Sequence, residues 1–171
     1  MTTNTIKTLF GFARSVLNTW TPFKAKSDSI SDIYNYLPID NLFSTSGQPS
    51  EAQFAVIREE GFETVINLAP TSVLENSVVN ESEILAALGM RYIHIPVDFK
   101  KPTDDDFGKF TTALEGKDCR RVWVHCAANM RVSAFTYRYR RYVLGEDGEV
   151  ANADLQKIWE PIGVWKAFLK Q

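Results

Sequence analysis

Apolar residues in this chain form short continuous runs in some places and recur every three or four positions in others. Short continuous runs predict buried strands, and the three-or-four spacing predicts amphipathic helices. The strands are predicted at residues 41–44, 63–68, 91–97 and 121–125. The helices are predicted at residues 50–60, 81–88, about 102–113, 132–144, 152–159 and 164–169. Strands that alternate with helices predict a single α/β domain, with a mostly parallel central sheet flanked by helices.

Local signals sharpen some of these elements. Ser50 is followed three residues later by Gln53, which predicts a capping box at the start of that helix. The run of β-branched and aromatic residues at 91–97 is continuous enough to predict a buried strand. The aspartates at 104–106 fall in a predicted first helical turn, where the helix dipole favours negative charge.

Composition narrows the class of protein. The chain has 171 residues, of which 44% are hydrophobic, and its net charge is −2. These values fit one domain with a full core, and argue against nucleic-acid binding through overall charge. No apolar run approaches the roughly 18 residues that a membrane span needs. Two cysteines, Cys119 and Cys126, are too few for a disulfide framework, so we expect the cytoplasm, with bacterial periplasm as the alternative. The only histidines, His94 and His125, give no Cys/His cluster with metal-ligand spacing.

Residues 1–28 differ from the domain that we expect at 29–171. Apolar side chains occur there at roughly helical spacing, with Lys7 and Arg14 between them: Ile6, Leu9, Phe10, Phe12, Val16, Leu17 and Trp20. This pattern predicts an amphipathic helix, which packs on the domain or docks on a partner, an interface or a second copy of the chain. Thr21-Pro22 and the polar residues 24–29 predict a linker.

The most informative segment runs from Val122 to Ser133. A predicted buried strand ends in His125-Cys126, and a short loop then leads through Arg131 into a helix. Backbone N–H groups and the helix dipole converge at such a point and favour anions. The same field stabilises a thiolate, so Cys126 is a candidate nucleophile, although a buried structural cysteine is the plain alternative.

Hydrolysis of a phosphate monoester needs donors for the phosphate oxygens as well as a nucleophile. The candidate phosphate-binding residues are those of the loop: Ala127, Ala128, Asn129, Met130 and Arg131. Arg131 can bind two oxygens at once, and Asn129 tolerates a left-handed backbone. We expect His125 to orient the loop through a backbone contact of its ring. Ser133 is expected to donate to the Cys126 sulfur when that sulfur becomes the leaving group.

The reaction also needs an acid for the leaving oxygen. Asp98 directly follows a predicted strand, and the carboxyl ends of parallel strands meet at one edge of the sheet. Asp98 is therefore the first choice as general acid, with a turn residue as the plain alternative. Asp104, Asp105 and Asp106 are its rivals, and helix-start charge explains at least two of them.

His125-Cys126, Arg131 and Ser133 after Arg-Val-Trp-Val resemble the phosphate-binding loop of cysteine-dependent protein tyrosine and dual-specificity phosphatases. Residues 45–50, 61–68 and 92–97 are similar to a bacterial branch called beta-lactamase-hydrolase-like phosphatases. The resemblance covers about residues 30–145. It implies a dual-specificity-phosphatase-like fold, a phosphocysteine intermediate at Cys126, phosphate binding by Arg131 and the loop amides, an acid near Asp98, and no metal or other cofactor.

One feature departs from the family pattern. Four residues separate Cys126 from Arg131, where the family has five, and a one-residue slip turns a helical side chain by ~100°. Rhodanese-like sulfurtransferases, in which Cys126 would hold a persulfide, often have four, but this loop lacks their glycine and extra basic residue. A third interpretation is a non-catalytic module that binds a phosphorylated partner. The substrate stays open among phosphotyrosine, phosphoserine or phosphothreonine, nucleotides and lipid head groups.

Overall fold

The computed structural model describes residues 3–19, 29–39, 43–72, 77–116 and 120–169, with the backbone alone for 14–19. This part of the chain contains a five-stranded sheet in the order β1-β2-β5-β3-β4. The strands are β1 (Leu37–Pro38), β2 (Phe43–Ser46), β3 (Thr64–Asn67), β4 (Arg91–His94) and β5 (Val122–His125). Only the β1–β2 pair is antiparallel among these strands, which confirms the predicted α/β class and mostly parallel sheet.

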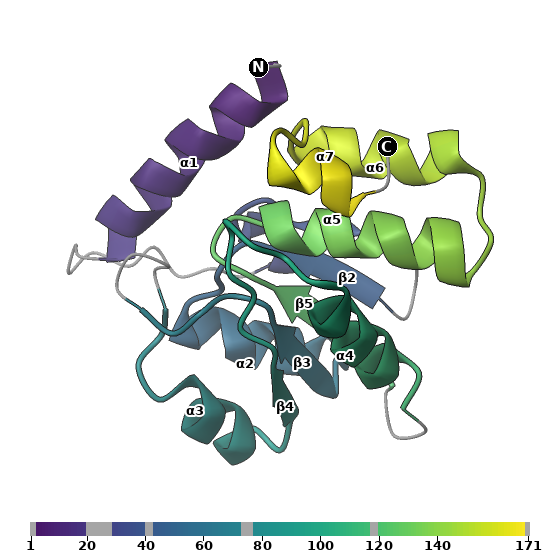
Figure 1. Ribbon diagram of the computed structural model, residues 1–171. Helices are drawn as coiled ribbons and strands as arrows, with labels where there is room; N and C mark the ends of the chain where they lie inside the picture. Colours follow the sequence, from purple (N-terminus) through teal and green to yellow (C-terminus); the bar gives the residue numbers. More distant parts are fainter. Residues whose placement is uncertain (1–2, 20–28, 40–42, 73–76, 117–119, 170–171) are drawn as a thin grey trace.

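Helices cover both faces of the sheet (Figure 1). The sheet carries α2 (Glu51–Glu59) and α3 (Glu81–Ala87) on one face, and α4 (Asp104–Leu114) and α5 (Met130–Arg138) on the other. Outside α5 lie α6 (Gly148–Ile158) and α7 (Val164–Phe168). Helix α1 (Thr3–Thr19) runs along the edge of the molecule. The short segment η1 (Ile30–Asp32) is a 3-10 turn.

The central strand β5 supplies side chains to two cores. Val122 and Val124 belong to the core under α5, while Trp123 between them belongs to the core under α2 and α3. Successive side chains of a strand point to opposite faces, so a continuous apolar run is what a strand covered on both faces requires. Cys126 directly follows β5, at the end of the sheet where the carboxyl ends of the parallel strands lie together.

Two helices, α2 and α4, begin with a capping box, and the one at α2 was predicted. The Ser50 side chain accepts from the amide of Gln53, and the Gln53 side chain returns a bond to the Ser50 amide, which confirms the predicted capping box. Thr103 and Asp106 form a second capping box at α4. Such pairs satisfy amides that the first helical turn leaves without partners.

Two sequence expectations need correction. The predicted buried strand at 91–97 is shorter, and β4 lies at the sheet edge with half-buried and exposed side chains. Within residues 91–97, only Ile95 and Val97, which follow the strand, are buried. The residues of a strand do not determine whether it lies at the edge or in the centre of the sheet, so the sequence did not predict the exposure of β4. The helix predicted at 132–144 begins earlier, at Met130, and continues as the π-helical segment η3 (Tyr139–Val143).

Helix α1 has the predicted helical backbone, but its polar face packs on the domain. Asn4 donates to the Gln156 carbonyl, and Thr5 accepts from the Glu160 amide. Ile6, Leu9 and Phe10 are exposed, Phe10 by 75%. Trp20, most of the predicted linker and Cys119 lie outside the described residues. Among the helices described, none is long and apolar enough to cross a membrane.

Candidate active site

Cys126 lies where three parallel strands end together. Ser46 of β2 and Asn67 of β3 are the register partners of His125 on either side of β5. The Cys126 amide donates to the Ser46 carbonyl at 3.4 Å, and the residue is 1% exposed. Helix α5 begins four residues later, at Met130. The structure thus confirms the predicted sequence of strand, cysteine, short loop and helix.

Two outside donors hold the backbone of the loop. The Ala127 carbonyl accepts from the Gln48 amide at 3.2 Å, and the Ala128 carbonyl accepts from the Asn35 side chain at 3.0 Å. In a trans peptide the N–H points away from the C=O, so the amides of Ala128 and Asn129 are directed away from these donors. This orientation is what an anion-binding turn of backbone amides requires.

Asn129 fixes the end of the loop. It has a left-handed backbone with φ of 64°, as the sequence suggested for this position. Its side-chain amide donates to the Asn35 carbonyl at 2.8 Å and to the Thr45 hydroxyl at 2.9 Å. The Ser133 amide then donates to the Asn129 carbonyl at 2.9 Å, which closes the first turn of α5.

Arg131 and Asp98 lie in neighbouring parts of the site. Arg131 is buried, its Nε donates to the Val97 carbonyl at 2.9 Å, and its guanidinium carbon is 5.1 Å from the centre of the Phe99 ring. Asp98 is the residue between Val97 and Phe99, and it is exposed. Its Oδ1 accepts from the Lys100 amide at 2.8 Å, which is the geometry of a turn residue. The backbone therefore brings the predicted acid close to the predicted phosphate-binding arginine.

The three rival aspartates are engaged at the start of α4. Asp104 pairs with Arg138 at 2.9 Å, and Asp105 pairs with Lys109 at 2.8 Å. Asp106 accepts from the amide and hydroxyl of Thr103 as part of the capping box. Each therefore has a local structural role, which leaves Asp98 as the carboxylate adjacent to Arg131.

Ser133 has partners other than the one predicted from the sequence. Its hydroxyl donates to the Met130 carbonyl at 3.1 Å and accepts from the Trp159 indole at 3.2 Å. Donation to the Cys126 sulfur would require the hydroxyl to leave Met130. The role suggested for Ser133 stays a prediction.

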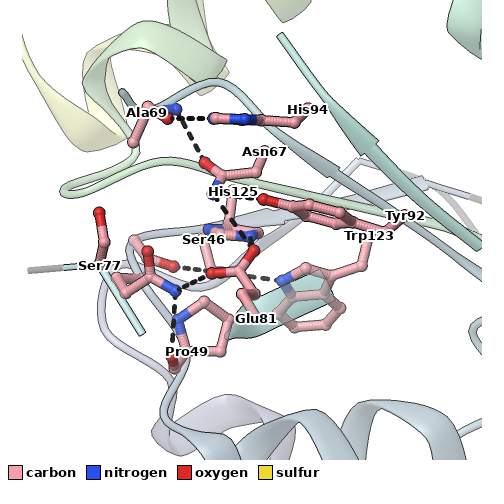
Figure 2. Close-up of polar contacts among 12 residues, drawn as sticks. Ser46, Pro49, Asn67, Ala69, Ser77, Glu81, Tyr92, His94, Trp123 and His125 are labelled. Carbon is pink, nitrogen blue, oxygen red and sulfur yellow. Dashed lines mark hydrogen bonds and ion pairs between the residues drawn. The ribbon is translucent and has the colours of Figure 1, made fainter. Parts of the chain in front are cut away.

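The His125 ring pairs with a carboxylate rather than with the backbone, which corrects the sequence expectation. Its Nε2 is 3.0 Å from Oε1 of Glu81, and neither side chain is more than 5% exposed. Glu81 also accepts from Gln48 at 2.9 Å and from Asn67 at 3.2 Å. Figure 2 shows this buried group and its continuation through Asn67 to Tyr92. Glu81, in α3, thus links His125, the residue before Cys126, to Gln48 in the turn after β2 and to Asn67 in β3.

The electrostatics of Glu81 follow from these contacts. Burial alone would raise its pKa, but the charge and hydrogen bond of His125 and the Gln48 amide outweigh burial, so the pKa of Glu81 is lowered. Burial, followed by the charge of Glu81, raises the pKa of Tyr92. Glu81 is therefore a buried, ionised acceptor, and Tyr92 beside it stays a neutral phenol.

The sequence did not single out Glu81 or Asn35. Glu81 looks like an ordinary acidic residue in a first helical turn, and its partner His125 is 44 positions away. Asn35 precedes the first strand and contacts Ala128 across 93 positions. Gln48 and Asn67 do fall in the segments that carry the family resemblance, and that was the available signal. Within the described residues, His, Cys, Asp and Glu side chains form no group of three that could hold a metal ion.

Comparison with known sequences gives consistent matches. A family model, "PTP-NADK: DSP-PTPase phosphatase fused to NAD+ Kinase", matches residues 14–159. A Beta-lactamase hydrolase-like protein from Agrobacterium fabrum is 30% identical over 122 residues, which are 69% of this chain and 27% of that protein. Its Xylella fastidiosa counterpart is 30% identical over 95 residues, 54% of this chain and 22% of that protein. The chain therefore spans about a quarter of the length of these curated relatives.

Solved structures agree on the fold. A DUF442 protein from Shewanella putrefaciens CN-32, described as a candidate phosphatase, superimposes with a TM-score of 0.72 at 29% identity, covering 82% of this chain and 92% of that chain. The core catalytic domain of the PP-IP phosphatase SIW14 from S. cerevisiae gives 0.68 at 11% identity, over 81% and 85%. TpbA from P. aeruginosa, in complex with pTyr, gives 0.61 at 19% identity, over 80% of each. These matches confirm the phosphatase resemblance and the dual-specificity-phosphatase type of fold.

Proposed function

Since the chain belongs to the family of DSP-PTPase phosphatases fused to NAD+ kinase, we propose that it hydrolyses a phosphate monoester by covalent catalysis at Cys126. The observation that carries the proposal is the position of this cysteine. Cys126 lies at the joined ends of β2, β5 and β3, four residues before the start of α5, in a loop whose Ala127 and Ala128 carbonyls are held by donors outside the loop. Amides and helix dipole at such a point stabilise both a thiolate and a bound phosphate.

In the first step the Cys126 thiolate attacks phosphorus and forms an S–P bond. The bond from phosphorus to the leaving oxygen breaks, and Asp98 gives its proton to that oxygen. In the second step water attacks the phosphocysteine, Asp98 accepts a proton, and inorganic phosphate leaves as the thiolate is restored. Asp98 is exposed, so the attacking water of the second step can reach it.

Arg131 and the loop amides are the proposed phosphate-binding groups. The Nε bond to Val97 fixes one edge of the guanidinium close to Asp98. A guanidinium can bind two phosphate oxygens in parallel, and its charge offsets the negative charge of the transferring group. The proposal covers phosphotyrosine and phosphoserine or phosphothreonine substrates alike.

The direct test uses an aryl phosphate with a chelator present. Wild type should hydrolyse p-nitrophenyl phosphate, and Cys126→Ser should lose about a thousandfold or more of kcat, because a serine hydroxyl is a far weaker nucleophile at neutral pH. Cys119→Ser, which changes the chain's other cysteine, is the matched control and should keep full activity. Equal rates for wild type and Cys126→Ser, or no hydrolysis over a broad phosphate panel, would overturn the proposal.

The acid role is tested by the leaving group. Asp98→Asn should slow hydrolysis of alkyl phosphates, which need protonation, by about a hundredfold or more, and change p-nitrophenyl phosphate much less. Asp105→Asn, a rival already paired with Lys109, is the matched control. If Asp98→Asn slows both substrates equally, the acid must be another group.

The four-residue spacing between Cys126 and Arg131 favours one second candidate, sulfur transfer. Cys126 would take the outer sulfur of thiosulfate as a persulfide, release sulfite, and pass that sulfur to cyanide. Formation of thiocyanate at a rate above that of phosphate ester hydrolysis would replace the phosphatase proposal with this one.

A further inference from the structure

The N-terminal helix is connected to the Cys126 loop through Asn35. The Asn35 side-chain amide donates to the Ala128 carbonyl at 3.0 Å and to the Thr8 hydroxyl of α1 at 3.4 Å. The Asn35 carbonyl accepts from the Asn129 side chain at 2.8 Å. One residue outside the loop thus bonds to two loop residues, Ala128 and Asn129, and to the helix at the edge of the molecule.

Tyr34 forms a second connection beside it. A Cβ atom added at Gly11 of α1 would lie 2.7 Å from the Tyr34 ring, and one added at Gly47 would also lie 2.7 Å from it. The ring is therefore fitted between α1 and the turn that follows β2. The Tyr34 hydroxyl donates to the Thr8 carbonyl, and the Tyr34 carbonyl accepts from the Gly47 amide at 2.7 Å. Gly47 in turn pairs with Ala128 of the loop.

The attachment of α1 to the domain combines a few hydrogen bonds with a small apolar contact, in which the partly buried Phe12 packs against the main core. Thr8 donates to the Ile158 carbonyl at 2.5 Å, and Thr5 accepts from the Glu160 amide at 2.8 Å. The apolar side chains Ile6, Leu9 and Phe10 are exposed, so they contribute little burial to this attachment. A helix held by a few hydrogen bonds and one partly buried apolar side chain can separate locally at lower cost than a helix of the core. The family match begins at residue 14, so Thr5, Thr8 and Gly11 lie outside it.

We propose that Asn35 is a positioning residue for the Cys126 loop, and that docking of α1 through Thr8 and Gly11 sets the affinity of that loop for phosphate. Asn35 holds the Ala128 carbonyl outward and keeps Asn129 in its left-handed conformation. Docked α1 holds Asn35 and Tyr34 in place. The inference rests on the proposed function for the identity of the anion, but its test does not need turnover.

The test measures how well inorganic phosphate protects Cys126 from alkylation by iodoacetamide, in the whole 171-residue chain with Cys119→Ser as the common background. Asn35→Ala should raise the phosphate concentration for half-protection about tenfold, since the side-chain bonds to the Ala128 carbonyl of the loop and to the Thr8 hydroxyl of α1 are both lost. Asn35→Asp, which keeps the size of the side chain but replaces its donor, is the second variant, and should shift protection in the same direction. Thermal unfolding of each variant is recorded in parallel.

Two variants on α1, each with a matched control, distinguish an effect on the position of the Cys126 loop from a general loss of stability. Thr8→Val and Thr5→Val each remove one docking bond to the α6 end, but only Thr8 contacts Asn35. Gly11→Ala places a methyl against Tyr34, whereas Gly108→Ala in α4 meets nothing within 4 Å. Thr8→Val and Gly11→Ala should weaken protection by about threefold, and their controls should leave it unchanged.

The outcomes are distinct. Protection that is the same in Asn35→Ala, Asn35→Asp and wild type, or that shifts equally in Thr8→Val and Thr5→Val, overturns the inference, as does a wild type that phosphate does not protect. If phosphate protects but no phosphate ester is hydrolysed, the proposed function fails while the expected shifts still support positioning by α1.

Discussion

The starts of α3 and α4 look alike in the sequence but differ in the structure. Each helix has acidic residues in its first turn, Glu81 and Glu83 in α3 and three aspartates in α4. Glu81 is 6% exposed and pairs with His125, the residue before Cys126. The side chains of Asp104 and Asp105 are 80% and 76% exposed, and they pair with Arg138 of α5 and Lys109 of α4. A carboxylate at a helix start thus belongs to the site only where the fold buries it among donors.

The physical difference is the cost of leaving each group without a partner. When a buried carboxylate is removed, its donors lose their acceptor, and water cannot reach them to replace it. An exposed carboxylate exchanges its partner for water at little cost. The contrast between α3 and α4 therefore predicts a graded series of substitutions.

The largest effect is expected for Glu81→Ala. It leaves His125, Gln48 and Asn67 without their shared acceptor, and should lower the free energy of unfolding by about 3 kcal/mol. Urea denaturation measures this value. Glu83→Ala, an exposed acid in the same helical turn, is the control and should change it by less than about 0.5 kcal/mol. Equal losses from the two variants would remove the distinction between Glu81 and an ordinary helix-start charge.

The next effect is a pH dependence of stability. Because the pKa of Glu81 is lowered in the folded state from its usual 4.5, its ionised form contributes stability above that value. This contribution is lost as pH falls from 4.5 through the lowered pKa. The stability difference between wild type and Glu81→Gln should therefore narrow over this acidic range, in denaturation curves recorded at successive pH values. A difference that widens on acidification would contradict the buried, ionised Glu81.

A smaller effect is expected at the α4 capping box. Asp106→Ala removes the acceptor for the amide and hydroxyl of Thr103, and should cost about 0.5–1 kcal/mol. Asp106→Asn keeps an acceptor oxygen and should recover part of that loss. Phosphatase activity should be unchanged in both, and a selective loss of kcat would place Asp106 in the site.

The smallest effect is expected for Asp105→Asn. Its ion pair with Lys109 is exposed, so stability should change by less than about 0.5 kcal/mol, and less still at high salt. Thermal unfolding at low and high salt measures the change. A loss comparable with that of Glu81→Ala would mean that exposure does not separate the two helix starts.

Much of the fold could be predicted from the sequence because its signals are local. The apolar run before Cys126 and the Ser50 capping box each lie within a few residues, and both are confirmed. The predicted burial of the strand at residues 91–97 was wrong because edge position depends on the partner strands. The apolar face of α1 predicted nothing of its Thr5 and Thr8 contacts, which depend on where α6 ends.

The residues of the candidate site also fall into those that local sequence signals predict and those that depend on tertiary contacts. Cys126 and Asn129 belong to one continuous segment, and the structure places them as expected, although the helix that follows begins at Met130, two residues earlier than predicted. Glu81 and Asn35 reach that segment only through tertiary contacts, and nothing in their own neighbourhood marks them. The catalytic roles of Arg131, Asp98 and Ser133 stay predictions that kinetics must test.

The most direct test of the central claim is a rapid-quench measurement of the intermediate. Wild-type protein is mixed with excess aryl phosphate, quenched in acid within milliseconds, and digested for mass spectrometry. We expect one phosphoryl group on the peptide that contains Cys126, and none on that peptide in Cys126→Ser. Hydrolysis that proceeds with no phosphoryl group on Cys126, or with the group on another side chain, would contradict it.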